Sequence, residues 1–530
     1  MLLALLFAAA PGAAAAGQSA AAAAGQSAAA AAGQSASGPA SAAGQSAAAA
    51  AGQSASGLAA SRAAAPGAAT PGPLANAGRW LVDPSGRVVV LHGLNMVYKL
   101  PPYQPGAVGF GRDDAGFLRR YGFNTVRLGL IYKAVEPQPG RYDSGYITKV
   151  RTLERMLARR GVYSLVDFHQ DLYNEKFTGE GWPDWAVLDD GLPAEPLTGF
   201  PGTYITSPGM NRAFDNFWSD ATGPGGVRLQ ERYAAAWARV AKSFGGDSGV
   251  LGYDILNEPW PGSGFAACLN TAGCPAVDAK LGAFYRRAIR GIRSADRSHV
   301  VFYEPQVLFN FGSDTSVPDL GRRLGFSFHI YCFAGLVSGA PANCPDLENF
   351  VFDNADARAR KTGDSLMLSE FGATDDISIL DRMTAFADRH MVSWQEWHYC
   401  GCGDPTTQGP GDTQAVVKDT SEPPRGSNVF HDKLRALARP YPQAIAGTPV
   451  RWSFDPDTKR FELVYTTKRV DAGGRFSRGL TEVFIPRVQY RHGFRARATG
   501  AATTRQGGQR LLLRAKPGAG RVELAVTPAS

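Results

Sequence analysis

Apolar residues along most of this chain gather in short continuous runs, and each run ends at polar or aromatic residues. The runs at 162–168, 250–256 and 365–369 are apolar along most of their length rather than at alternate positions. Such runs predict strands that are buried on both faces, as in a parallel sheet. Between the runs, apolar residues recur at helical spacing, as at Tyr146, Val150, Leu153 and Leu157, and Gly161 ends that segment.

Eight predicted strands alternate with predicted helices from residue 76 to residue 440. We therefore expect an α/β fold, a (β/α)8 TIM barrel, over 76–440. A hairpin at about 79–91 precedes the first barrel strand and is expected to cover the bottom of the barrel. Helices are expected near 112–121, 144–160, 227–244 and 277–294.

The pattern changes after the barrel. Short strands at 452–454, 461–465, 481–485 and 510–514 are separated by turns rich in Gly, Pro and Asp. This spacing predicts a small C-terminal β-sandwich over 445–530.

The first 75 residues have a different composition. Residues 1–16 are apolar and then small, which resembles a signal peptide, although the first side-chain charge in the chain is Arg62. Residues 17–75 repeat Gly-Gln-Ser-Ala between alanine tracts, and this predicts a low-complexity linker. We expect a secreted or extracellular protein, including one held at the cell surface.

Six cysteines fall into three close pairs in loops that follow predicted strands. In an exported protein this spacing favours local disulfides, and metal binding is the weaker alternative because no histidine cluster accompanies the cysteines. The expected pairs are Cys268 with Cys274, Cys332 with Cys344, and Cys400 with Cys402.

The positive charge lies in the C-terminal domain. Residues 445–530 hold sixteen Lys and Arg against six Asp and Glu, a net charge of +10, so the rest of the chain carries −2 of the total +8. Such a surface suits an anionic membrane or acidic glycans, and a solvated face without a partner fits equally well. We expect no nucleic acid as a partner, because no recognition motif accompanies the charge.

Two glutamates stand where apolar strands end. Glu258 follows the run at 250–256, and Glu370 follows the run at 365–369. The strand ends of a barrel meet at its C-terminal rim, where barrel enzymes keep their catalytic residues. A pair of carboxyl groups across a cleft indicates glycosidic bond cleavage, and Glu304, at the end of the fifth strand, is the rival for a catalytic role.

Other polar residues accompany this pair. Arg127 lies inside an apolar strand, and a buried arginine needs a carboxylate, for which Glu370 is the candidate. Further strand ends bring polar or aromatic side chains to the same rim: Lys99, His169, Asp171, Asn257, His329, Tyr331 and Trp397. No metal and no cofactor are expected, because the histidines are scattered and hydrolysis by two carboxyl groups uses protons alone.

Four motifs are more specific than the fold. They read His-Gly-Leu-Asn-Met-Val-Tyr-Lys at 92–99, Asp-Phe-His-Gln-Asp-Leu-Tyr at 167–173, Asn-Glu-Pro-Trp at 257–260 and His-Ile-Tyr-Cys at 329–332. The barrel resembles glycoside hydrolase family 5, and these motifs together resemble its endoglycoceramidases. The resemblance implies a retaining enzyme that cleaves the β-glycosidic bond between the oligosaccharide and the ceramide of glycosphingolipids.

The resemblance also implies roles for residues. Glu258 would be the acid/base and Glu370 the nucleophile, with Lys99, His169, Asp171, Asn257, Tyr331 and Trp397 lining the substrate site and Arg127 and His329 supporting it. Apolar loops at 307–311 and 333–337 are candidates for the ceramide side, and packing under the rim is their alternative. The basic domain would hold the rim against an anionic membrane. The alternative functions are a secreted endo-β-glucanase or mannanase of the same fold, and a non-catalytic glycan-binding protein.

Overall fold

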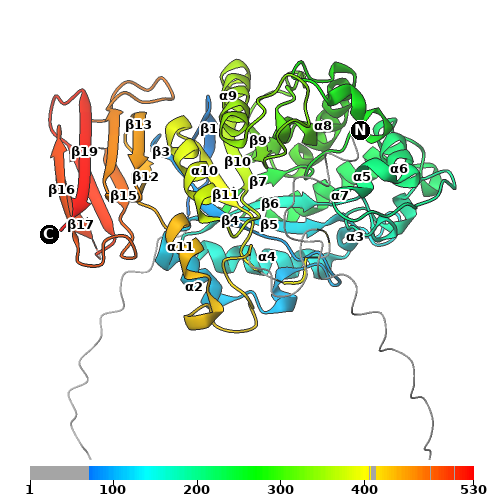
Figure 1. Ribbon diagram of the computed structural model, residues 1–530, viewed down its shortest axis with the longest axis horizontal. Coiled ribbons are helices and arrows are strands. Elements are labelled where there is room, and N and C mark those ends of the chain that lie inside the picture. The colour runs from blue at the N-terminus through cyan, green and yellow to red at the C-terminus, as the bar shows by residue number, and fades with distance from the viewer. Residues whose placement is uncertain are drawn as a thin grey trace, which may run out of the picture. The chain divides into compact units, whose positions relative to one another are not determined.

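Eight parallel strands close into a barrel in the computed structural model, which describes residues 71–400, 402–404, 406, 414–477, 479–506 and 508–529 (Figure 1). The strands follow one another around the barrel in chain order. They are β4 (His92–Met96), β5 (Thr125–Ile131), β6 (Tyr163–His169), β7 (Val250–Asp254), β8 (Val300–Tyr303), β9 (Leu324–Ile330), β10 (Ser365–Phe371) and β11 (Ser393–Glu396). The predicted TIM barrel is confirmed.

Helices surround this barrel, and every barrel strand except β8 is followed by an α-helix before the next element of the sheet begins (Figure 1). The 3₁₀ helix η6 (Val307–Phe311) stands in the connection from β8 to β9. The principal helices are α2 (Arg112–Tyr121), α4 (Ser144–Ala158), α7 (Leu229–Phe244), α8 (Pro275–Ala295), α9 (Cys344–Thr362), α10 (Ile377–His390) and α11 (His431–Leu437). The short helices α3 (Tyr132–Val135), α5 (Thr203–Thr206) and α6 (Pro208–Trp218) lie in rim loops.

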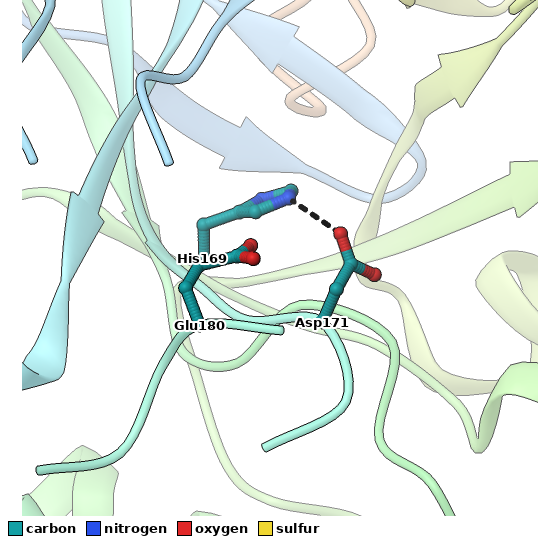
Figure 2. Close-up of side chains that lie close together, drawn as sticks. All are labelled: His169, Asp171 and Glu180. Carbon is teal, nitrogen blue, oxygen red and sulfur yellow. Dashed lines mark ion pairs between the residues drawn. The ribbon is translucent and has the colours of Figure 1, made fainter. Parts of the chain in front are cut away.

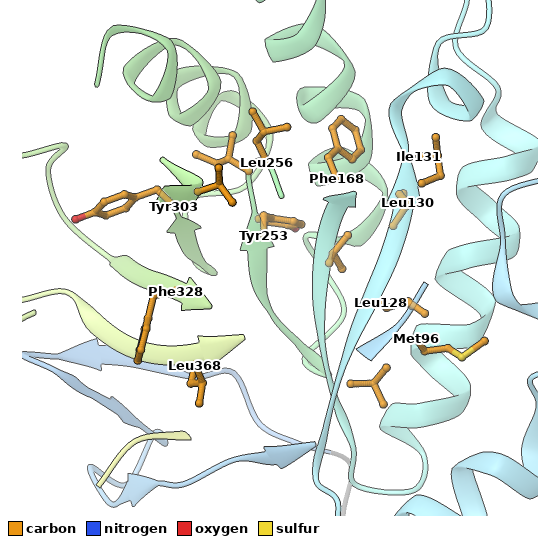
Figure 3. Close-up of a cluster of buried hydrophobic side chains, with 14 of the residues drawn as sticks. Met96, Leu128, Leu130, Ile131, Phe168, Tyr253, Leu256, Tyr303, Phe328 and Leu368 are labelled. Carbon is orange, nitrogen blue, oxygen red and sulfur yellow. The ribbon is translucent and has the colours of Figure 1, made fainter. Parts of the chain in front are cut away.

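Helix α4 shows why the sequence folds as predicted. Asp143 caps its first turn, where the carboxylate accepts the Tyr146 N–H at 2.8 Å. The apolar stripe that includes Val150 and Leu157 is fully buried. Figure 3 shows part of the same core, where Leu128 and Phe168 from the barrel strands lie among other apolar side chains.

The interior of the barrel changes from apolar to polar along its axis. Alternate residues of a strand face the same side, so Leu165, Asp167 and His169 of β6 share one face. Leu165 belongs to an apolar cluster at the start of the strands, together with Leu251 and Met367. The interior is therefore apolar at the bottom and polar toward the C-terminal rim.

The N-terminal hairpin closes the bottom of the barrel, as predicted. Leu81 and Val89 belong to the same apolar cluster as Leu165 and Met367. The hairpin strands β1 (Ala75–Ala77), β2 (Trp80–Val82) and β3 (Val88–Val89) also extend a sheet of the C-terminal domain, because β3 pairs with β12 (Tyr441–Ile445). This pairing, between segments about 350 residues apart in the chain, was not predicted.

Two antiparallel sheets form the C-terminal domain (Figure 1, orange to red). The first has the order β1-β2-β3-β12-β15-β18-β17, with β15 (Leu480–Phe484), β17 (Ala501–Gln506) and β18 (Arg510–Ala515). The second has the order β13-β14-β19-β16, with β13 (Thr448–Phe454), β14 (Phe461–Thr466), β16 (Phe494–Thr499) and β19 (Arg521–Pro528). Buried side chains from both sheets form one apolar cluster, so the domain is a β-sandwich.

The expected signal peptide (1–16) and the expected linker up to residue 70 lie outside the described residues. Within the described part of the chain, no helix has both the length and the apolar character that crossing a membrane requires.

We expect Asp388→Ala to loosen the contact between barrel and sandwich. Asp388, near the end of α10, accepts the Trp452 indole N–H at 2.8 Å and an Arg439 guanidinium N–H at 3.3 Å. Arg439 is only 2% exposed, so the variant leaves a buried cation without its main partner, at a cost of about 3 kcal/mol. Thermal unfolding measures the effect.

Asp381→Ala is the matched control, because Asp381 is partly exposed and lies 3.5 Å from the same guanidinium. Its loss should cost less than about 1 kcal/mol. Equal changes in unfolding temperature for the two variants would contradict the assignment.

Candidate active site

Arg127 lies at the centre of the polar half of the barrel and is inaccessible to solvent. Its guanidinium binds the Glu370 carboxylate, donates to Asp254 Oδ2 at 3.1 Å and donates to Glu304 Oε1 at 2.9 Å. Asp167 Oδ1 lies 3.0 Å from the same group. Four carboxyl groups from four strand ends thus surround one buried cation, and the predicted pair of Arg127 with Glu370 is present.

Glu258 and Glu370 face each other across this rim. A carboxylate oxygen of each lies within 4.8 Å of the other and of a His329 ring nitrogen. Glu370 follows a register shift in β10 and is the register partner of His329 in β9, which places the two side chains beside each other. The spacing suits a retaining glycosidase, in which the two carboxyl groups stand about 5 to 5.5 Å apart.

Each glutamate has its own set of partners. Glu370 is bound by Arg127 on one oxygen and accepts the Tyr331 hydroxyl on the other at 3.0 Å. Glu258 Oε1 accepts an Asn310 amide N–H at 2.9 Å and lies 2.9 Å from His329 Nδ1. The guanidinium and the hydroxyl together hold both oxygens of Glu370 in place.

The environment of Glu258 favours the protonated form. Burial raises the pKa of Glu258, the charge of Glu370 adds to this rise, and contact with His329 opposes it. The net direction is upward, as a general acid requires. The two carboxyl groups therefore differ in the way that an acid and a nucleophile must differ.

His329 carries positive charge between the two glutamates. Burial lowers its pKa, but the charges of Glu304 and Glu370 and the contact with Glu258 outweigh burial and raise it well above the ordinary value. Nδ1 lies 2.9 Å from Glu258 and 3.5 Å from Glu370, and Nε2 lies 3.3 Å from Glu304. An imidazole that serves carboxylates on both nitrogens must be protonated on both.

A second polar cluster surrounds Lys99 on the neighbouring part of the rim. Its ammonium donates to Asp171 Oδ2 at 2.6 Å and to Thr406 Oγ1 at 2.9 Å, and Asp404 Oδ2 lies 3.1 Å away. The same ammonium stands 4.5 Å from the centre of the Trp397 ring. This arrangement of donors, acceptors and one aromatic ring is suited to sugar hydroxyls.

Figure 2 shows three side chains of this cluster, His169, Asp171 and Glu180, gathered from β6 and the loop that follows it. His169 Nε2 lies 3.7 Å from Asp171 Oδ2, and its ring stacks on Trp397 with centres 5.2 Å apart. Burial raises the pKa of Glu180 well above its ordinary value, and neither of its carboxyl oxygens has a hydrogen-bond partner among the described residues.

Those three side chains could geometrically hold a metal ion, since their ligand atoms lie within 4.8 Å of one another. Lys99 already supplies a cation to this group, because its ammonium contacts Asp171 and lies 4.0 Å from Glu180. A divalent ion there would be repelled by the ammonium and by a protonated His169. The donor set therefore fits poorly with a resident metal.

The two apolar loops predicted for the ceramide side contain both buried and half-buried side chains. Val307, Leu308 and Phe309 are buried in the core, which was the alternative. Phe311 and Phe333 are half-buried and pack edge to face with ring centres 5.1 Å apart. Phe311 is the chain neighbour of Asn310, which binds Glu258.

The structure brings every predicted site residue to the rim, in two groups around Arg127 and Lys99. Asn257 joins the first group, where its Oδ1 accepts an Arg127 N–H at 3.0 Å. Six contributors were missed, namely Asp167, Asp254, Glu180, Asn310, Asp404 and Thr406. Carboxylates inside apolar strands were a usable signal for Asp167 and Asp254, since the buried Arg127 needs such partners.

All three predicted disulfides are present: Cys268–Cys274, Cys332–Cys344 and Cys400–Cys402. Each lies in a loop on the C-terminal side of a barrel strand. The bridge at Cys332 begins just after Tyr331, so it pins the loop that carries Phe333 close to the site.

A TIM barrel with two adjacent carboxyl groups in unlike surroundings on its C-terminal rim is the arrangement of a glycoside hydrolase. The family model of cellulase (glycosyl hydrolase family 5) matches residues 112–403, and that of the glycoside hydrolase family 5 C-terminal domain matches residues 439–526. The chain belongs to glycosyl hydrolase family 5.

Relatives with assigned activities agree with this membership. Endoglycoceramidase I of Rhodococcus hoagii (strain 103S) is 31% identical, over 85% of this chain and 87% of the relative. An endoglycoceramidase of Hydra vulgaris is 28% identical, over 78% of this chain and 81% of the relative. Endo-glycoceramidase II from Rhodococcus sp. has solved structures that include a lactosyl-enzyme intermediate, with a TM-score of 0.66 and 28% identity over 85% of this chain and 100% of that chain, and a ganglioside GM3 complex.

We expect His169 to make stability depend on pH. Burial lowers the pKa of His169, but the hydrogen bond with Asp167 and the nearby Asp171 carboxylate outweigh this and raise it to about 9. The unfolded value is about 6.5, so the stabilisation is complete below about pH 6.5 and is lost as the pH rises through about 9. The difference in unfolding temperature between wild type and His169→Asn should be large at pH 6 and shrink by pH 9.5.

The full effect is on the order of 3 kcal/mol. His492→Asn serves as the control, because His492 is exposed on the sandwich. A stability gap for His169→Asn that stays constant with pH would show that the ring contributes by packing alone.

Proposed function

We propose that this protein is an endoglycoceramidase that works by a retaining mechanism, with Glu258 as acid/base and Glu370 as nucleophile. The observation that carries the proposal is the close placement of the two carboxyl groups in unlike environments. Glu370 is bound by a guanidinium and a hydroxyl, whereas burial raises the pKa of Glu258.

In the first step, Glu370 attacks the anomeric carbon and forms a glycosyl ester. Glu258 donates its proton to the glycosidic oxygen, so the ceramide leaves as a neutral alcohol. Arg127 and Tyr331 orient the Glu370 carboxylate, and Asn310 orients the Glu258 carboxyl group.

In the second step, water enters where the ceramide left. Glu258, now ionised, removes a proton from this water as it attacks the anomeric carbon, and the ester bond to Glu370 breaks. The sugar leaves with its original anomeric configuration. The imidazolium of His329, between the two carboxyl groups, stabilises whichever of them carries the negative charge.

Glycosphingolipid is proposed as the substrate on two grounds. The relatives that cover most of this chain are endoglycoceramidases, and one solved relative is a complex with ganglioside GM3. The half-buried rings of Phe311 and Phe333 pack on each other in the loops after β8 and β9, and an apolar pair there would suit a lipid aglycone better than a second sugar.

Export from the cytoplasm is also proposed, and three disulfides support it.

For the basic sandwich we propose attachment to an anionic membrane, supported by the exposed Arg487, Arg491, Arg495 and Arg497. The sandwich joins the barrel at the bottom, opposite the rim, through β3 and β12. With this attachment, we propose that the sandwich tethers the enzyme to the surface rather than pressing the rim against it.

Replacing either glutamate by glutamine should reduce turnover by several orders of magnitude, because each takes part in bond breaking. An aryl β-glycoside with an acidic phenol separates the roles, since its leaving group needs little protonation. Its phenol should still be released in a burst by Glu258→Gln and not by Glu370→Gln. The reverse pattern would exchange the two roles.

Incubation with a glycosphingolipid and with a soluble β-glucan tests the substrate class. We expect intact oligosaccharide and ceramide from the lipid and no product from the glucan. Phe333→Ser should raise KM for the lipid several-fold and leave a soluble aryl glycoside unaffected. Cleavage of the glucan alone would favour the endoglucanase alternative.

Arg487→Gln with Arg491→Gln should weaken binding to anionic vesicles, by up to about 1 kcal/mol for each arginine that reaches the surface. Cleavage of detergent-dispersed substrate should not change. Arg286→Gln with Arg290→Gln, on exposed positions of α8, removes the same charge and is the control. Salt should reduce wild-type binding toward that of the sandwich variant, and binding that is insensitive to salt and to both changes would refute the tether.

A further inference from the structure

Glu304 has no role in the proposed two-carboxylate reaction, yet it touches three groups of the site. It follows β8 and is only 2% exposed. Oε2 accepts the main-chain N–H of Glu258 at 2.9 Å, and Oε1 accepts from Arg127 at 2.9 Å. Oε1 also lies 3.3 Å from His329 Nε2.

The main chain at Glu258 needs such support. Its φ is +42°, in the left-handed region that a residue with a side chain rarely adopts. Holding this conformation is unfavourable, and a charge-assisted hydrogen bond to its N–H offsets the strain. The direction in which the Glu258 carboxyl group projects is therefore fixed from the main chain.

The second contact concerns the charge on His329. Charged groups face this ring from several elements: Glu258 and Asp254 from β7 and its loop, Glu304 after β8, Glu370 on β10 and Arg127 on β5. Among the described residues, Glu304 is the ion-pair partner of Nε2, whereas Nδ1 lies beside Glu258 and Glu370. A negative charge there favours a proton on both ring nitrogens.

We propose that Glu304 is a positioning residue for the acid, which fixes the main chain of Glu258 and keeps His329 an imidazolium between the two reacting carboxyl groups. This inference rests on the proposed roles of Glu258 and Glu370. Glu304 is assigned no part in bond breaking, because the proposed reaction needs only Glu258 and Glu370. The oxygens of Glu304 contact Arg127 and the Glu258 N–H.

Glu304→Gln removes the charge and keeps the shape. The pKa of His329 should fall, and a neutral His329 no longer lowers the pKa of Glu258, which it contacts directly. The alkaline limb of kcat/KM for an aryl glycoside should therefore move to higher pH, by about one unit. The value of kcat/KM at the optimum should fall at least tenfold.

Asp254→Asn is the matched control. Asp254 binds the same guanidinium and the Ser327 hydroxyl, and burial raises its pKa well above the ordinary value, but among the described residues its hydrogen bonds reach neither the Glu258 N–H nor His329. This variant should keep the wild-type pH profile. Glu304→Asp keeps the charge but shortens the reach to the Glu258 N–H, so kcat should fall while the profile stays in place.

Histidine side-chain NMR reads the protonation of His329 without any turnover, with the resonance assigned from a His329→Gln spectrum. We expect an imidazolium at pH 7 in wild type and in Asp254→Asn, and a ring that titrates at lower pH in Glu304→Gln. If His329 titrates alike in all three proteins, or if Glu304→Gln and Asp254→Asn share the wild-type pH profile, the proposal is wrong. Failure of the proposed function would appear instead as full activity in Glu258→Gln or Glu370→Gln.

Discussion

The buried guanidinium of Arg127 is the constraint on which the site depends. A cation without access to solvent is stable only where carboxylates surround it, and four strand ends supply Asp167, Asp254, Glu304 and Glu370. Those strand ends meet only when the barrel closes with the right register. The same contacts that make the buried charge tolerable therefore also place the nucleophile.

The ionisation of the neighbouring side chains depends on the cluster around Arg127. Burial raises the pKa of Asp254, and the excess negative charge of four carboxyl groups around one guanidinium adds to that rise. The same charge outweighs the effect of burial on His329 and raises its pKa. The imidazolium lies between Glu258 and Glu370, while burial keeps Glu258 inclined to hold its proton. Glycoside hydrolysis with retention requires one protonated carboxyl group and one carboxylate bound by cations.

Much of this arrangement could be predicted from the sequence, because apolar runs locate buried strands and their ends locate the rim. The pairing of Arg127 with Glu370 followed from the need of a buried arginine for a carboxylate. The contact of Asn310 with Glu258 and the cluster of Lys99 with Asp404 could not be predicted, because they depend on how long loops return to the rim. The pairing of β3 with β12 joins distant segments that carry no local signal for each other.

The central claim is that Glu370 forms a covalent bond with the sugar while Arg127 and Tyr331 hold it. A 2-deoxy-2-fluoro β-glycoside with a good leaving group slows the second step more than it slows the first, so the glycosyl-enzyme accumulates. Peptide mass spectrometry then locates the sugar. The account predicts one sugar per chain, attached to Glu370 and absent from Glu370→Gln. A sugar on Glu304 or Glu258, or hydrolysis with inverted anomeric configuration and no adduct, would contradict it.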